Sequence, residues 1–291
     1  MITKPIPYGR QHITDEDIQC VIDALKSDYL TQGPKIKEFE EAFASYVGCK
    51  YAIAVNNATA GLHLAATALD VNLGDKVIVT PLTFAASANC IRFRGGEVVF
   101  CDVEEDTYLM DIKKLSRLLS QSPKGTYKGI VLVDFAGYPA NLEAFRQLAD
   151  EYGLWIIEDA CHAPGGYFID SKGEKQLCGN GNFADISVFS FHPVKHIATG
   201  EGGMATTNSK KLYEKLCLYR THGITKDPAL LCENHGGWYY EMQELGYNYR
   251  ITDFQAALGI SQLKRADFQQ TIDGKQTDLY FLRNKNGIEI A

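Results

Sequence analysis

The chain has 291 residues, 45% of them hydrophobic, so it can form one large domain with a buried core, or a large and a small domain. The formal net charge is -7. We expect no extended nucleic-acid surface, because phosphate contacts need clustered Lys and Arg, although a local pocket can still bind an anionic substrate. No apolar stretch reaches about 18 residues, so we expect no membrane-spanning helix.

The eight cysteines contain no C-x-x-C pair. Their spacing suits neither a structural zinc site nor a compact disulfide scaffold. We therefore expect reduced, mostly buried thiols in a cytoplasmic protein, and no metal site. No apolar run follows residues 1–5, so no secretory signal is expected either.

Short apolar runs alternate with helical patterns along the chain. The residues predict strands at 51–55, 76–80, 97–102, 129–135, 154–157, 185–190 and 203–207, and helices at 61–69, after Pro81 and at 142–152. This alternation favours an α/β fold with a mostly parallel sheet covered by helices. Two polar segments that contain Gly are predicted to be an exposed excursion (172–182) and a mobile loop (227–237).

The loops after the predicted strands are candidates for a binding site. In sheets of this type, ligands bind at the carboxyl ends of strands, where loops meet helix N-termini. These loops carry small residues, hydroxyls, an aromatic ring and acids, at 56–59, 81–84, 137–139, 158–160 and 191–193. We expect them to cluster along one edge of the sheet.

Lys195 lies in one of these loops, between the end of a strand at Ser190 and the flexible stretch 199–203. A Schiff-base lysine needs a short, fixed approach to an aldehyde and a neighbourhood that keeps its amine neutral part of the time. An ordinary surface lysine is the alternative interpretation. The flanking pattern favours the Schiff-base role.

Three further loops offer groups that a flat, phosphorylated cofactor needs. Asp159 follows an apolar strand and suits a partner for a pyridinium nitrogen, although a helix cap or a metal ligand would use the same residue. Thr59 and Ala60 open a helix whose free N–H groups can bind a phosphate, and Ser190 can add a hydroxyl. Phe84 can stack on a ring, although a core position is the usual one for Phe.

Six segments together resemble the DegT/DnrJ-type sugar aminotransferases, which are pyridoxal-phosphate enzymes of fold type I. They lie at 30–34, 57–61, 80–89, 157–162, 190–195 and 245–253, so the resemblance reaches from near the N-terminus to about Lys264. In particular, residues 190–203, 220–224 and 238–250 resemble transaminases of pseudaminic acid biosynthesis. That resemblance implies amino transfer from glutamate, which leaves as 2-oxoglutarate, to C4 of a 4-keto-6-deoxy UDP-N-acetyl hexose.

The resemblance also implies a role for each matching residue. Lys195 would be the Schiff-base lysine and would move the proton, as opposed to the His that replaces it in related sugar dehydratases. The expected cofactor contacts are Asp159 at the pyridinium nitrogen, His162 near the phenolate oxygen, Thr59, Ala60 and Ser190 at the phosphate, and Phe84 on the ring. Asn248 would reach the phosphate of a neighbouring subunit, which implies a homodimer with shared sites. Tyr8, Thr31 and Arg250 are candidates for the sugar-nucleotide site.

The family pattern fades after about Asp267. We therefore expect a large cofactor-binding domain at 1–250 and the start of a truncated C-terminal domain at 251–291. One hypothesis is that the cofactor site is present while turnover is impaired. The alternatives are a non-catalytic relic that binds the cofactor, and a different pyridoxal-phosphate enzyme that acts on sugars.

Overall fold

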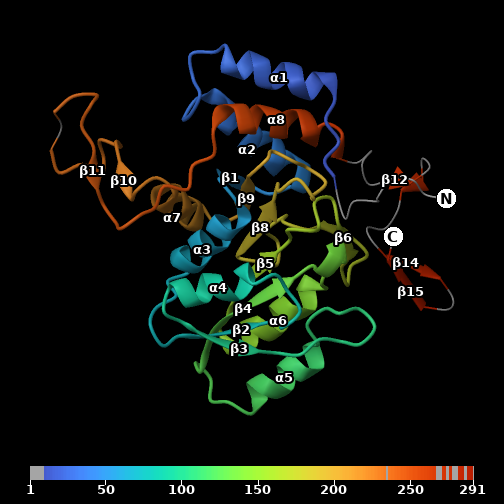
Figure 1. Ribbon diagram of the computed structural model, residues 1–291. Coiled ribbons are helices and arrows are strands. Elements are labelled where there is room, and N and C mark those ends of the chain that lie inside the picture. Colours follow the sequence, from blue (N-terminus) through green and yellow to red (C-terminus); the bar gives the residue numbers. More distant parts are fainter. Residues whose placement is uncertain are drawn as a thin grey trace.

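A seven-stranded sheet forms the centre of the computed structural model, which describes residues 10–233, 235–266, 271–272, 275–276, 281–284 and 287–290 (Figure 1). The strand order is β1-β9-β8-β5-β4-β2-β3. Their bounds are β1 (Tyr51–Val55), β2 (Lys76–Val79), β3 (Glu97–Phe100), β4 (Tyr127–Val133), β5 (Trp155–Asp159), β8 (Ile186–Ser190) and β9 (Gly203–Thr207). Strands from β8 to β3 pair in parallel, whereas β9 is antiparallel to both of its neighbours. The prediction of a mostly parallel α/β sheet is confirmed.

Helices cover both faces of this sheet. One face carries α3 (Ala58–Ala68), α4 (Ala86–Phe93) and α7 (Lys210–Arg220), which share one apolar cluster with the strands. On the other face, α5 (Ile112–Ser120) and α6 (Leu142–Tyr152) pack over β2, β4 and β5. There, α2 (Pro34–Val47) and α8 (Asp253–Leu263) pack over β1, β9 and β8. Burial of these apolar faces is the main stabilising contribution to such a three-layer fold.

The outermost helix, α1 (Asp15–Leu25), lies on α8 (Figure 1). The Gln262 Nε2–H donates to Asp17 Oδ2 at 2.8 Å, and Arg265 forms an ion pair with the same carboxylate. Thus α8 is held between α1 and α2. The domain boundary at residue 250 stays a prediction.

The remaining elements are short. They are the 3-10 turn η1 (Phe135–Gly137) and the hairpins β6 (Tyr167–Ile169) with β7 (Lys175–Leu177), β10 (Ile224–Thr225) with β11 (Glu241–Met242), β12 (Thr271–Ile272) with β13 (Lys275–Gln276), and β14 (Phe281–Asn284) with β15 (Gly287–Ile290). In Figure 1 the β10–β11 hairpin extends away from the sheet next to α7.

Polar caps explain why several helices begin where they do. Asn57 Oδ1 accepts from the Ala60 N–H at 2.8 Å and starts α3, and Asn141 caps α6 in the same way. Helix α6 ends at Gly153, whose φ of 69° is the left-handed conformation that glycine adopts without strain. The predicted helix at 142–152 therefore has the bounds that the structure shows.

The prediction of an exposed excursion at 172–182 is wrong for its second half. Gln176, Cys178 and Asn180 are buried. Polar side chains pack here because they satisfy one another: the Asn180 and Asn182 amides both donate to Gln176 Oε1 at 2.9 Å. The tip of the β6–β7 hairpin, residues 171–175, is exposed as predicted.

All eight cysteines are free thiols: three are buried, four are half-buried and Cys232 is exposed. Among the described residues, no helix has both the length and the apolar character that a membrane crossing needs.

Candidate active site

Lys195 lies in a loop that leaves β8 and returns to β9. Backbone hydrogen bonds close this loop: the Phe191 N–H donates to Gly202 O at 2.9 Å, and the Thr199 N–H donates to Phe191 O at 2.9 Å. The Lys195 N–H donates to His192 O at 2.8 Å, which fixes the backbone beside the amine. Burial lowers the pKa of Lys195, while the neighbouring Cys161 and Asp159 raise it. A lysine in this environment is neutral more often than one on an open surface.

Asp159 ends β5, and two donors fix its buried carboxylate. The Ser87 Oγ–H donates to Asp159 Oδ2 at 2.6 Å, and the Cys161 N–H donates to Oδ1 at 3.2 Å. Ser87 is fully buried, and its oxygen lies 2.7 Å from Thr83 Oγ1. Because Ser87 gives its proton to the carboxylate, Thr83 is the donor in that second contact. The chain Thr83–Ser87–Asp159 therefore orients the carboxylate.

The contribution of Ser87 was not predicted from the sequence. Thr83 lies just before α4 and Ser87 in its first turn, four residues apart, and their hydroxyls meet there. This spacing was the available signal. Its meaning depends on Asp159 lying opposite, and only the tertiary structure shows that.

His162 follows Asp159 by three residues, and a backbone N–H donates a hydrogen bond to its ring. The Ala136 N–H donates to His162 Nδ1 at 3.2 Å. Burial lowers the pKa of His162, and the charge of Lys195 lowers it further. A neutral ring that accepts at Nδ1 carries its proton on Nε2, so His162 presents an N–H donor from Nε2.

The N-terminus of α3 packs directly on Gly203. A Cβ at this position would lie 2.7 Å from the Ala58 nitrogen, so only glycine allows the two backbones this close. Since Gly203 pairs with Val55 on one side and Ser190 on the other, the first turn of α3 and the end of β8 lie on either side of it.

Two backbone donors remain open at this helix N-terminus. Among the described residues, the Ala58 and Thr59 N–H groups have no partner, and Ser190 is buried beside them in the register of the sheet. The Ala60 N–H is not open, because the Asn57 side chain accepts from it, and the contact of Ala60 with a phosphate stays a prediction. An anion at this N-terminus would therefore meet Ala58 and Thr59 first.

The segment that contains Asn248 and Arg250 runs past the same region. The Asn56 N–H donates to Tyr249 O at 2.9 Å, and Asn248 pairs with Thr221 in an isolated bridge. Asn248 is exposed and Arg250 is half-buried.

Thr31 is exposed, precedes α2 in the chain, and forms an isolated bridge with Thr252 of this segment. The backbone thus links Thr31 to the Asn248–Arg250 stretch, but no hydrogen bond joins their side chains in the described part of the chain. Tyr8 lies outside the described residues.

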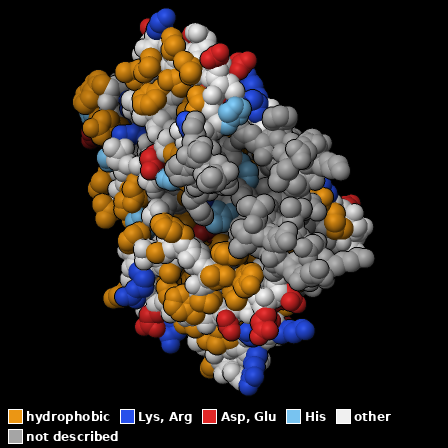
Figure 2. Space-filling view, turned by 45° about the vertical axis from the view of Figure 1, so that its right-hand side comes forward, with side chains coloured by type: hydrophobic (Ala, Val, Ile, Leu, Met, Phe, Trp, Pro, Cys, Tyr) orange, Lys and Arg blue, Asp and Glu red, His pale blue; other side chains and the backbone are white. Residues whose placement is uncertain are grey.

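Phe84 is 76% exposed in the loop before α4, so its ring is open to a ligand. Exposure alone does not identify a ligand contact here. Large hydrophobic side chains such as Trp238 and Leu245 are also exposed, and Figure 2 shows broad hydrophobic patches on the face that it draws. The stacking role stays a prediction.

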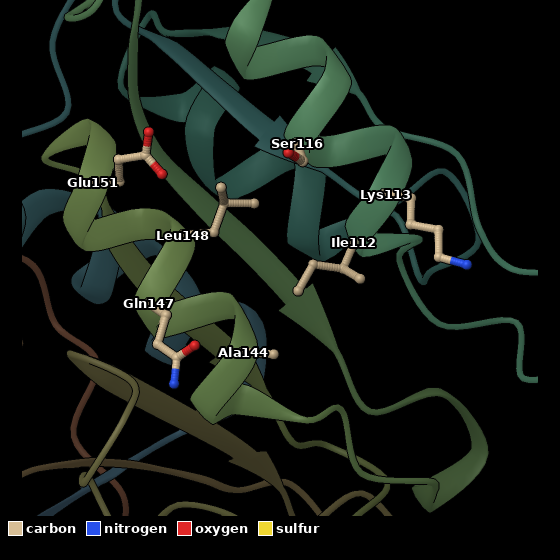
Figure 3. A pocket seen from close by; sticks show the side chains of 7 residues that line it. All are labelled: Ile112, Lys113, Ser116, Ala144, Gln147, Leu148 and Glu151. Atoms are coloured by element: carbon tan, nitrogen blue, oxygen red, sulfur yellow. The ribbon is translucent and has the colours of Figure 1, made fainter. Parts of the chain in front are cut away.

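A separate hollow of about 520 Å³ lies between α5 and α6 (Figure 3). Figure 3 shows side chains from both helices directed into it, among them Ile112, Leu148 and Glu151. None of the predicted site residues lines it, and among the described residues no hydrogen bond joins its hydroxyl, Ser116, to its acid, Glu151. We therefore do not place the active site there.

The fold and the edge of the sheet define a class of site. A lysine of lowered pKa after β8, a fixed carboxylate at the end of β5, an N–H donor on a half-buried imidazole and an open helix N-terminus after β1 all lie at the carboxyl ends of these strands. This donor set fits a planar, phosphorylated cofactor that carries an aldehyde.

The chain belongs to the DegT/DnrJ/EryC1/StrS aminotransferase family, whose model matches residues 11–282. It is 43% identical over 263 residues to the UDP-4-amino-4,6-dideoxy-N-acetyl-beta-L-altrosamine transaminase of Campylobacter jejuni, covering 90% of this chain and 65% of that protein. Among solved structures, it is similar to Helicobacter pylori PseC, an aminotransferase of pseudoaminic acid biosynthesis, with a TM-score of 0.79 and 33% identity over 91% of this chain and 67% of that one.

A proposed sugar aminotransferase from Streptococcus pneumoniae, solved in its PLP-form, has a TM-score of 0.77 and 30% identity, with coverage of 90% of this chain and 67% of that one. The family and this relative imply pyridoxal 5'-phosphate as the cofactor. The chain spans 65–66% of the length of the curated relatives that it matches.

Proposed function

We propose that this chain transfers an amino group from glutamate to C4 of a 4-keto-6-deoxy UDP-N-acetyl hexose. The observation that carries the proposal is the placement of Lys195 beside Asp159, Cys161 and His162, where burial lowers the pKa of its amine. Substrate and donor follow from the likeness to the Campylobacter jejuni transaminase, whose name contains the 4-amino sugar.

Lys195 would attach the cofactor and would then move a proton at the reacting carbon. A neutral amine is required for both steps, because an ammonium group is no nucleophile and no base. Burial provides that neutral fraction. The closed loop between β8 and β9 holds the backbone at Lys195, so the amine stays at one edge of the sheet.

Pyridoxal phosphate, when bound, supplies the electron sink that stabilises a carbanion. Asp159 would hold the proton of its ring nitrogen, with Ser87 keeping the carboxylate oriented. The His162 Nε2–H would donate to the oxygen on the ring, and Phe84 would cover one face of the ring. Thr59, Ala60 and Ser190 would surround the phosphate, with the open N–H groups of the first turn of α3 as donors.

The second substrate and the second subunit extend this site. Asn248 is exposed near the N-terminus of α3, a position that suits contact with the phosphate bound by a partner subunit, so we propose a homodimer with shared sites. Thr31 and Arg250, with Tyr8, are the residues proposed to line the sugar-nucleotide site. The half-buried guanidinium of Arg250 suits a diphosphate.

A two-step titration of the purified chain tests the proposal. After PLP is added, borohydride should fix the cofactor on the peptide that contains Lys195, as detected by mass and absorbance. Lys195→Ala should abolish the fixation, whereas Lys172→Ala, which changes an exposed hairpin lysine, should not. If the wild-type chain fixes no cofactor, the site assignment is wrong.

Glutamate should then bleach the absorbance band of the bound cofactor, and a 4-keto UDP-sugar should restore it. Bleaching without recovery would contradict the proposed sugar substrate. Binding without bleaching would favour the alternative of a non-catalytic protein that holds the cofactor.

A further inference from the structure

Two carboxyl groups are buried together next to the proposed cofactor site. Asp134 directly follows β4 and Glu158 lies in β5, and each is 1% exposed. An oxygen of each and the Cys178 sulfur all lie within 4.8 Å of one another. Because side chains alternate along a strand, Glu158 lies on the sheet face opposite Asp159. The pair is therefore outside the group of residues proposed to touch the cofactor.

Each carboxyl group has one satisfied oxygen and one unsatisfied oxygen. The Ala140 N–H donates to Asp134 Oδ1 at 2.9 Å, and the Gly179 N–H donates to Glu158 Oε2 at 3.0 Å. The described residues give Asp134 Oδ2 and Glu158 Oε1 no hydrogen bond of good geometry, although the Ser187 hydroxyl and the Cys178 thiol lie close enough to Glu158 to lower its pKa. No described Lys, Arg or His forms an ion pair with either group.

Two buried anions at this separation, without a cation, would repel each other and would both lose their hydration. One proton removes one of the charges and supplies the donor that both free oxygens lack. Burial, and then the charge of Glu158, raise the pKa of Asp134 well above its usual range, and burial raises the pKa of Glu158. The other titratable groups facing the pair are the thiols of Cys178 and Cys161, and burial raises the pKa of both.

We propose that Asp134 and Glu158 share a single proton, and that this pair positions the backbone N–H that orients His162. Asp134 anchors both ends of the loop concerned: its N–H donates to Asp159 O at 3.1 Å, and its Oδ1 accepts from Ala140.

Within that loop, Ala136 adopts a φ of 53°, a conformation that a residue with a side chain holds only when its surroundings fix it. The Ala136 N–H then reaches His162 Nδ1. The importance of His162 for catalysis rests on the proposed function, whereas the shared proton does not.

The substitution Asp134→Asn tests the proton without removing the loop anchor. Asn keeps an oxygen for the Ala140 N–H, and its amide N–H can donate to Glu158 Oε1, so the variant should fold. Between pH 5 and 7, the wild-type chain should take up one more proton when it folds than the variant does. The ratio of the wild-type to the variant folding constant should therefore fall tenfold for each pH unit, measured by urea unfolding.

Equal pH slopes for the wild-type chain and the double variant Asp134→Asn/Glu158→Gln, in which neither side chain can ionise, would overturn the shared proton. So would a stoichiometric metal ion in the purified wild-type chain whose removal by a chelator lowers its stability, because the ion would then replace the proton between the oxygens.

The positioning of His162 is tested by NMR of isotope-labelled histidines, in the absence of any cofactor. The wild-type chain and Asp134→Asn should both show His162 protonated on Nε2 alone. Asp134→Ala should shift this signal toward a mixture of tautomers. The matched control is Asp170→Ala, which removes a carboxylate that accepts from backbone N–H groups in the β6–β7 hairpin and should leave His162 unchanged. An Nε2-only signal in Asp134→Ala would overturn the positioning role.

Discussion

Removing the Ser87 hydroxyl isolates the hydrogen bond that fixes Asp159. In Ser87→Ala, the carboxylate loses a donor at 2.6 Å and Thr83 loses its acceptor at 2.7 Å, in a place where Ser87 is fully buried. A hydrogen bond to a charged group contributes about 1.5–3 kcal/mol, and a neutral one about 1 kcal/mol. Because Thr83 can rotate to find another partner, we expect the free energy of unfolding to fall by about 2–3 kcal/mol.

Urea unfolding of the cofactor-free chain measures this loss as a lower midpoint with an unchanged slope. The same substitution should weaken PLP binding by about tenfold, which corresponds to about 1.4 kcal/mol, because the carboxylate is no longer held toward one direction. The matched control is Ser116→Ala, which truncates an exposed serine on α5 and should change stability by less than about 0.5 kcal/mol.

If Ser87→Ala were as stable as Ser116→Ala and bound PLP equally well, the contact between Ser87 and Asp159 would contribute nothing. That result would refute the assignment of Ser87 as the residue that orients Asp159.

Three further substitutions test other parts of the structure. Gly203→Ala places a methyl group 2.7 Å from the backbone of α3. It should lower the free energy of unfolding by more than about 2 kcal/mol and abolish PLP binding. The control Gly237→Ala, with no atom within 4 Å of the new methyl, should change neither stability nor PLP binding. Arg220→Met leaves the half-buried Glu40 carboxylate without its cation and should cost about 3 kcal/mol in chemical unfolding; a change below about 1 kcal/mol would show that water replaces the pair. Burial lowers the pKa of His63 to about 4, so the unfolded chain binds the extra proton between pH 6.5 and 4, and the stabilising contribution present above pH 6.5 is lost as the pH falls. Over that range the wild-type chain should lose about 2 kcal/mol more than His63→Phe, after allowance for solvent screening, and parallel curves would contradict this.

Local patterns predicted most of the strands because each lies between strong boundary signals. The strands at 51–55 and 203–207 have the predicted bounds, and β5 begins one residue later than predicted and continues to Asp159. The order of the strands and the reversed direction of β9 could not be predicted, because they depend on pairing between residues about 150 positions apart.

In the candidate site, too, local patterns were predictable and long-range contacts were not. Lys195 and Asp159 could be selected from the strand-end loops, and the electrostatic contact between them supports their selection. Ser87 could not, because its spacing from Thr83 has no functional meaning until the acceptor, Asp159, is known. The buried half of 172–182 was predicted to be exposed because Gln and Asn usually lie on surfaces. Here the hydrogen bonds to Gln176 compensate these side chains for the loss of hydration.

The position of β9 between β1 and β8 also has a consequence for the order in which the chain folds during its synthesis. Strand β1 lies at the edge of the sheet, and its one neighbour, β9, begins at residue 203. At a translation rate of about 5–20 residues per second, the apolar β1 leaves the ribosome roughly 7–30 s before its partner. The junction of α3, Gly203 and Ser190 therefore forms late, and a chaperone that protects β1 until then should raise the yield of native protein.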